Sequence, residues 1–215
     1  MTTSRKQLGT STGSRATAHL GKTLEKNLVA YIAAAAATGV GALALGQSAE
    51  AKIVYTPTNI NVTNGLGLDL NNDGVNDFTF VSTTSGVGWY VAVKPVYSGN
   101  LIWGKHPNQG AAYASALRAG VTVRASKKLQ ASHTYMCDVN IETSGGPWLG
   151  AKNRYLGLKL LINGKAHYGW ARLSFSACNG TLTGYAYETI ANKSIKTGKT
   201  KGPDVITVEP ASLGT

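Results

Sequence analysis

The sequence predicts an all-β protein, an antiparallel β-sandwich of jelly-roll-like type. Short apolar segments alternate with turn residues along most of the chain, which has 26 glycines among 215 residues. Hydrophobic residues make up 43% of the chain and charged residues only 14%, as is typical of a packed domain. Two Asn-Gly pairs, at 163–164 and 179–180, separate the last three apolar segments, and this dipeptide favours β-hairpin turns.

The first 51 residues are predicted to be a signal peptide, a signal helix that follows a long polar leader. The 18 residues 28–45 are uncharged and follow Lys22 and Lys26, while Ala49 and Ala51 supply the small residues of a cleavage site. We therefore expect cleavage after Ala51 and a secreted or cell-surface protein that meets the membrane only during export. The alternative is an uncleaved anchor, because 18 apolar residues just suffice to span a bilayer.

Residues 52–195 are predicted to form the sandwich domain. The expected strands are 52–56, 60–63, 66–70, 77–83, 89–97, 121–126, 135–143, 154–162, 165–175 and 181–189. In the strand 154–162, Leu156, Leu158 and Leu160 share the face assigned to the core, and Tyr155 points the other way. Residues 109–119 show a weak helical pattern, and residues 196–215 are predicted to be a C-terminal tail or linker.

The two cysteines, Cys137 and Cys178, follow the cleavage site. In an oxidising compartment an even pair favours one disulfide, which would close a loop of about 40 residues. Two buried free thiols are the alternative.

The carboxylate loop, residues 69–77, has a spacing typical of calcium sites. Ca²⁺ prefers six to eight oxygen ligands, and side chains at alternate positions can converge on one ion if the chain curls around it. The expected ligands are Asp69, Asn71, Asp73, the carbonyl of Val75, and Asp77. Strand-like flanks and Phe80 at the twelfth position exclude an EF-hand, and the loop resembles those of FG-GAP and related β-repeat proteins.

We therefore expect a structural calcium ion. With three carboxylates and no glutamate at the twelfth position, its expected dissociation constant is about 10⁻⁴–10⁻³ M. The alternative is a solvated Asp-Gly turn held by hydrogen bonds of its own side chains.

The net charge of +11 raises the question of an anionic partner. Five basic residues precede the first apolar run and the other 16 are dispersed, apart from four near the C-terminus, so we expect no nucleic-acid site. A basic polyanion-binding module is an alternative that would require the lysines to form one continuous face. The four lysines near the C-terminus are Lys193, Lys196, Lys199 and Lys201.

No hydrolase or nucleotide-binding motif is present, and His106, His133 and His167 are isolated in the sequence. Glu142 and Glu188 are the candidate acids of an alternative, a jelly-roll carbohydrate-active enzyme. Aromatic residues provide a further hint, because exposed rings can stack on sugars, although aromatic residues also fill sandwich cores. The candidates are Trp89, Tyr90, Trp103, Trp148, Tyr168 and Trp170.

The C-terminal third carries a wider resemblance. The segments YGWARL, residues 168–173, and GYAYE, residues 184–188, resemble the ending of exported bacterial proteins of the PEP-CTERM type. Glu209-Pro210 matches part of that family's tail, and the apolar sorting helix is either absent or would begin where this sequence ends. The resemblance implies a secreted envelope or matrix protein. We therefore expect a non-enzymatic, exported β-sandwich protein with a structural calcium site and polysaccharide as its partner.

Overall fold

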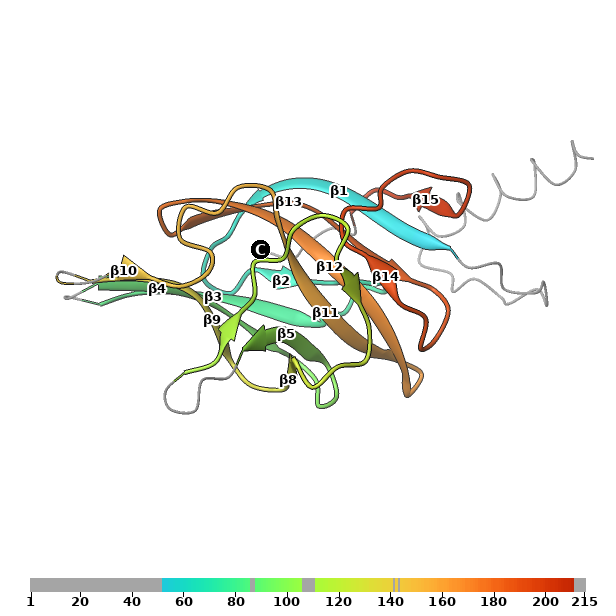
Figure 1. Cartoon of the computed structure of the whole chain (residues 1–215), viewed down its shortest axis with the longest axis horizontal. Helices are drawn as coiled ribbons and strands as arrows, with labels where there is room; N and C mark the ends of the chain where they lie inside the picture. The colour runs from blue at the N-terminus through green and yellow to red at the C-terminus, as the bar shows by residue number, and fades with distance from the viewer. Residues whose placement is uncertain (1–51, 86–87, 106–110, 141, 143, 211–215) are drawn as a thin grey trace, which may run out of the picture. The chain divides into compact units, whose positions relative to one another are not determined.

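The computed structural model describes residues 52–85, 88–105, 111–140, 142 and 144–210, which form a β-sandwich (Figure 1). This confirms the predicted all-β fold class. The predicted signal segment 1–51 lies outside the described residues. Among the described residues, no helix is long and apolar enough to cross a membrane.

Fifteen strands are present in the described residues. They are β1 (Ile53–Asn61), β2 (Gly67–Leu68), β3 (Phe78–Ser85), β4 (Gly88–Pro95), β5 (Leu101–Lys105), β6 (Tyr113–Ala114), β7 (Thr122–Val123), β8 (Leu129–Gln130), β9 (Thr134–Asn140), β10 (Ser144–Gly145), β11 (Arg154–Ile162), β12 (Lys165–Ser176), β13 (Asn179–Glu188), β14 (Ile195–Lys196) and β15 (Val205–Thr207).

The strands form two layers that share β5. The first sheet has the order β15-β1-β13-β12-β11-β5, and the second continues as β5-β6-β9-β4-β3-β2. Ile102 of β5 pairs with Leu158 on β11, whereas Gly104 of the same strand pairs with Ala114 on β6. Most neighbours are antiparallel, but β15 runs parallel to β1 and β6 runs parallel to β9.

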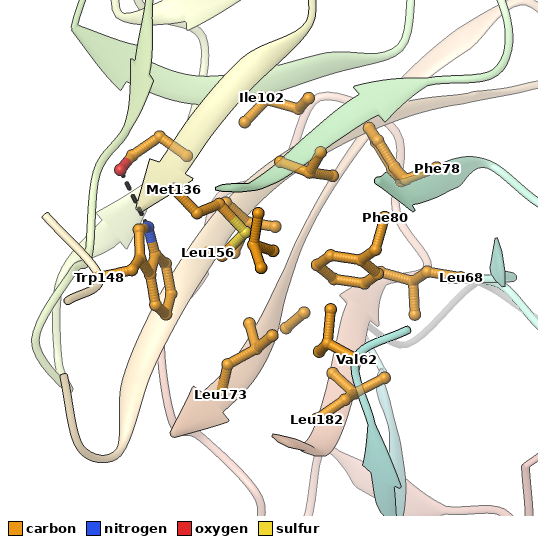
Figure 2. Packing of buried hydrophobic residues seen from close by; sticks show 14 of the residues in the cluster. Val62, Leu68, Phe78, Phe80, Ile102, Met136, Trp148, Leu156, Leu173 and Leu182 are labelled. Carbon is orange, nitrogen blue, oxygen red and sulfur yellow. Dashed lines mark hydrogen bonds between the residues drawn. The ribbon is translucent and has the colours of Figure 1, made fainter. Parts of the chain in front are cut away.

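The main core lies between the two sheets, as Figure 2 shows. The second sheet contributes Phe78 and Phe80, and the first contributes Leu156, Leu173 and Leu182, all fully buried. The alternation predicted for 154–162 is confirmed, since the three leucines assigned to the core are all in this cluster. Burial of this apolar surface is the main favourable term in folding.

The outer face of the first sheet is covered as well. Tyr155 lies on the face opposite to the main core, as predicted, and it is buried with Tyr168 and Trp170 in a second apolar cluster. Trp103 packs there above Gly157, where an added Cβ would lie only 2.9 Å from the Trp103 Cβ. The glycine therefore leaves room on this face for the Trp103 side chain of the neighbouring strand β5.

Two sequence predictions need correction. Within 109–119, the described residues 111–119 contain β6 and no helix, because this segment pairs with β5 and β9. The tail predicted from residue 196 is part of the fold as far as Thr207. Strand β14 pairs with β7, and β15 adds to the edge of the first sheet beside β1.

The predicted disulfide between Cys137 and Cys178 is confirmed. The two Cα atoms are 5.8 Å apart, and both residues are buried in the main core.

Candidate functional site

The carboxylate loop connects β2 to β3 and is curled by its own side chains. Asp69 is buried, and its carboxylate oxygens accept hydrogen bonds from the backbone N–H groups of Asp73 (3.2 Å) and Gly74 (2.7 Å). Asp73 in turn accepts from the backbone of Val75 (2.9 Å) and from the side-chain amide of Asn71 (2.8 Å). These are the local bonds expected for an Asp-Gly turn, and they hold Asp69, Asn71 and Asp73 close together.

Burial and mutual repulsion disfavour charge in this loop. Asp77 accepts a hydrogen bond from the backbone of Leu70 at 2.9 Å, but burial, with the charges of Asp69 and Asp73, raises its pKa to about 6. Burial also raises the pKa of Asp69. Carboxylates placed so closely repel one another when ionised, and a bound cation would relieve that repulsion.

The side-chain oxygen of Asn71 is buried and has no hydrogen-bond partner among the described residues. A buried acceptor without a donor costs free energy, and this oxygen belongs to the predicted calcium ligands. The described residues nevertheless contain no group of three or more His, Cys, Asp or Glu side chains arranged to hold a metal ion. The ligand set is therefore still a prediction, and Asn71 is the residue that fits it best.

Asn100 anchors the carboxylate loop to the rest of the sandwich. Its buried side-chain nitrogen donates to the backbone carbonyl of Asp77 (3.2 Å) and to that residue's carboxylate (3.4 Å). Its side-chain oxygen accepts from the backbone N–H of Leu161 on β11 (2.9 Å). Sequence patterns did not single out Asn100, because an asparagine after a Ser-Gly pair is also typical of an ordinary solvated turn.

Most of the aromatic residues considered as a sugar platform are buried. Trp148 and Trp170 have no exposed surface, and the indole N–H of Trp148 donates to the carbonyl of Ala114 (Figure 2). Trp103 and Tyr168 are also buried. These four side chains fill the two cores, as expected of large aromatics in a sandwich.

Tyr90, another of these candidates, belongs to a group of rings on the outer side of the second sheet. We call it the aromatic face; it consists of Tyr90, Tyr113, His133 and Tyr135. The Tyr135 ring centroid is 5.1 Å from those of Tyr90 and His133 and 6.1 Å from that of Tyr113. All four side chains are partly exposed. The rings therefore form one continuous group over β4, β6 and β9.

A β-bulge places Tyr135 in this group. Simple alternation along β9 would put Met136 and Cys137 on opposite faces, yet both are buried in the main core. The pairing register shifts between Val91 and Ala92 of β4, and this irregularity accommodates the extra residue on β9. The Tyr135 side chain therefore lies on the outer side of the second sheet.

Charged groups border the aromatic face. The Tyr113 hydroxyl donates to the Asp138 carboxylate at 3.2 Å, and burial together with that negative charge raises the pKa of Tyr113. Lys94 is exposed on β4. Burial and the positive charge of Lys94 lower the pKa of His133. The face thus combines flat apolar rings with a hydrogen-bond acceptor and a cation.

The structure does not bring the two candidate acids together. Glu188 is buried at the end of β13, where it pairs with Lys193 at 3.3 Å and accepts the backbone N–H of Ile190 at 3.1 Å. Glu142 is exposed in the connection between β9 and β10. Figure 1 shows β10 and β15 at opposite ends of the view, and β15 lies beside the beginning of β1, which pairs with Glu188.

The histidines give no catalytic constellation in the described part of the chain. The Nδ1 atom of the buried His167 lies 2.9 Å from the carbonyl oxygen of Glu188, which is a structural contact. His133 belongs to the aromatic face, and His106 lies outside the described residues.

Two of the four C-terminal lysines are neutralised by nearby acids. Lys193 pairs with Glu188, and Lys199 pairs with Asp204. This pairing disfavours a binding face built from all four lysines.

A scan against protein-family models, a search of curated proteins and a search of solved structures each found no match.

Proposed function

We propose that this chain is an exported, non-enzymatic protein of a bacterial cell envelope or extracellular matrix, and that it binds polysaccharide through the aromatic face. The observation that carries the proposal is the group of four partly exposed rings on β4, β6 and β9. A disulfide between Cys137 and Cys178 is consistent with an oxidising compartment. The resemblance of the C-terminal segments to PEP-CTERM-type proteins points the same way.

The chemistry of sugars fits this surface. One side of a sugar ring is rich in C–H groups and packs against an aromatic ring, while its hydroxyl groups need polar partners at the edge. Tyr90 and Tyr135 provide the rings, and Asp138 provides an acceptor for hydroxyl groups. A group of partly exposed rings on one surface is typical of an interaction site, so their grouping favours a binding role.

We also propose that the carboxylate loop binds a structural calcium ion. The ligands would be Asp69, Asn71, Asp73, the carbonyl of Val75, and Asp77. Support comes from the unpartnered oxygen of Asn71 and from the raised pKa of Asp77, since both indicate a site that lacks positive charge. Calcium would supply that charge and would fix the connection between β2 and β3.

Binding to immobilised polysaccharides, measured by a glycan array and then by titration calorimetry, tests the main proposal. Substituting Tyr135→Ala should weaken binding about tenfold or more, because Tyr135 contacts all three other rings of the face. Tyr97→Ala is the matched control, since Tyr97 is 52% exposed and lies outside the face. Absence of binding to any polysaccharide, or equal losses in the two variants, would contradict the proposal.

A further inference from the structure

An open cavity of about 590 Å³ borders the aromatic face. This volume is within the range of small-ligand sites. Tyr113 lines the cavity and also belongs to the aromatic face, so the two form one continuous surface. The other lining residues come from β5 and from the segments after β6 and β10: Lys105, Ser115, Ala116, Gly146 and Pro147.

Lys105 supplies a cation to this cavity. It is the last residue of β5 and pairs with Tyr113 across the β5–β6 ladder, so both side chains are on the same face of the sheet. Lys105 is exposed and forms no ion pair with any described residue. An ammonium group that is not already neutralised can attract an anionic group of a ligand.

The charge of the chain supports an anionic ligand. Residues 52–215 include 16 Lys and Arg but only eight Asp and Glu. Three of the eight acids belong to the carboxylate loop, and Glu188 and Asp204 pair with lysines. Asp138 is the carboxylate that contacts the aromatic face, while Lys94 and Lys105 stand at two places beside it. The aromatic face and its cavity therefore carry a net positive charge, with the Asp138 carboxylate as one hydrogen-bond acceptor.

A single-stranded nucleic acid would also offer negative charge and flat rings. The Asp138 carboxylate, however, needs a hydrogen-bond donor, and the phosphate groups of a nucleic-acid backbone are acceptors. A sugar polymer suits the same groups better, because its hydroxyl groups can donate to Asp138 and its carboxylates can pair with lysine.

Building on the proposed polysaccharide binding, we propose that the ligand is an acidic polysaccharide of the uronic-acid type. Its sugar rings stack on Tyr90 and Tyr135, and one carboxylate enters the cavity and pairs with Lys105. A hydroxyl group of the neighbouring sugar donates to Asp138. The cavity thus selects a negatively charged ligand, and the aromatic face binds its sugar rings.

Titration calorimetry with short oligogalacturonides and with their methyl esters tests this assignment, because the two ligands share one backbone and differ in charge. The unsubstituted protein should bind the acid about tenfold more tightly than the ester. Lys105→Gln should remove that preference and leave the affinity for the ester unchanged. Lys165→Gln makes the same change of charge at the exposed β11–β12 turn and should retain the preference.

The outcomes separate this inference from the proposed function. Equal affinity for acid and ester, or an equal loss for both ligands in Lys105→Gln, overturns the acidic-ligand assignment while polysaccharide binding stands. Tighter binding of a single-stranded oligodeoxynucleotide than of the oligogalacturonide overturns it in favour of a polyanion site. Absence of binding to any sugar polymer overturns both.

Discussion

The disulfide between Cys137 and Cys178 joins β9 of the second sheet to the β12–β13 turn of the first sheet. Both residues are buried in the main core, and 41 positions separate them in the chain. The bond therefore constrains the unfolded chain by closing a long loop, and it links the two layers of the sandwich at a site that the register of β9 determines.

Replacing both cysteines by alanine should lower the free energy of unfolding by about 4 kcal/mol, the value expected from closing a loop of this length. Urea denaturation of the oxidised protein and of the double variant, Cys137→Ala with Cys178→Ala, measures the difference. Reduced unsubstituted protein is the control and should unfold near the midpoint of the variant. Coincident transitions for oxidised protein and variant would show that the bond adds no stability.

Asn100→Ala should lower the free energy of unfolding by about 2–4 kcal/mol. The substitution leaves the backbone N–H of Leu161 and the carbonyl of Asp77 without their buried partners. Asn59→Ala at an exposed position on β1 is the control and should change stability by less than about 0.5 kcal/mol. Equal effects in urea denaturation would rule out the anchoring role of Asn100.

The fold could be predicted from the sequence wherever the alternation of residues along a strand determines which side chains are buried. The pleat of a strand forces Leu156 and Leu158 to the same side, so alternation alone identified the core face. The second apolar cluster could not be predicted in this way. It brings Trp103 and Ile195 into one cluster with Trp170, and nothing local to these segments indicates that association.

The candidate site was likewise predictable from the sequence only in part. The spacing of the carboxylate loop was visible in the sequence, whereas Tyr90 was the one member of the aromatic face that the sequence singled out as a sugar-binding candidate. Tyr135 lies beside a bulge that breaks the alternation of β9, and Tyr113 belongs to a segment with a weak helical pattern that tertiary pairing overrides. Strand β15 has only three residues in a segment rich in Gly and Pro, so its pairing with β1 left little local signal.

Calcium should raise the melting temperature of the purified protein. At about 10 mM calcium, a site with the expected affinity would stabilise the folded state by about 1–3 kcal/mol. Asp73→Asn should reduce the response, because it removes a charge at an exposed loop position while an acceptor for the Val75 N–H is kept. Glu209→Gln removes an exposed charge elsewhere and should respond fully. A transition unchanged between calcium and chelator would exclude the ion.

In the presence of a calcium chelator, ionisation of Asp77 should lower the free energy of unfolding as the pH rises. Its pKa is raised from 3.8 to about 6 in the folded protein, so between these values the folded state binds more protons than the unfolded chain. The stabilisation is present below about pH 4 and is lost as the pH rises through about 6, with a total effect on the order of 3 kcal/mol. Asp77→Asn should lack this component, and urea denaturation of both proteins from pH 4 to 7 measures it. Parallel stability curves would contradict the predicted burial effect.

The last prediction concerns His133, which directly precedes β9, and Lys94 on the neighbouring strand β4. Burial and the charge of Lys94 lower the pKa of His133 from 6.5. The folded protein therefore binds this proton less readily than the unfolded chain, so the stability that His133 contributes is present above about pH 6.5 and is lost as the pH falls.

Nuclear magnetic resonance titration of the histidine ring protons should show His133 titrating below 6.5 in the unsubstituted protein. Lys94→Gln should move its pKa upward, because the substitution removes a nearby positive charge but leaves the ring equally buried. The value should stay below 6.5 in this variant, since burial is the larger of the two causes. Lys165→Gln, which removes an equal charge from the turn between β11 and β12, should leave the His133 titration unchanged. Identical shifts in both lysine variants would mean that net charge, and not the nearby charge of Lys94, governs the pKa of this histidine.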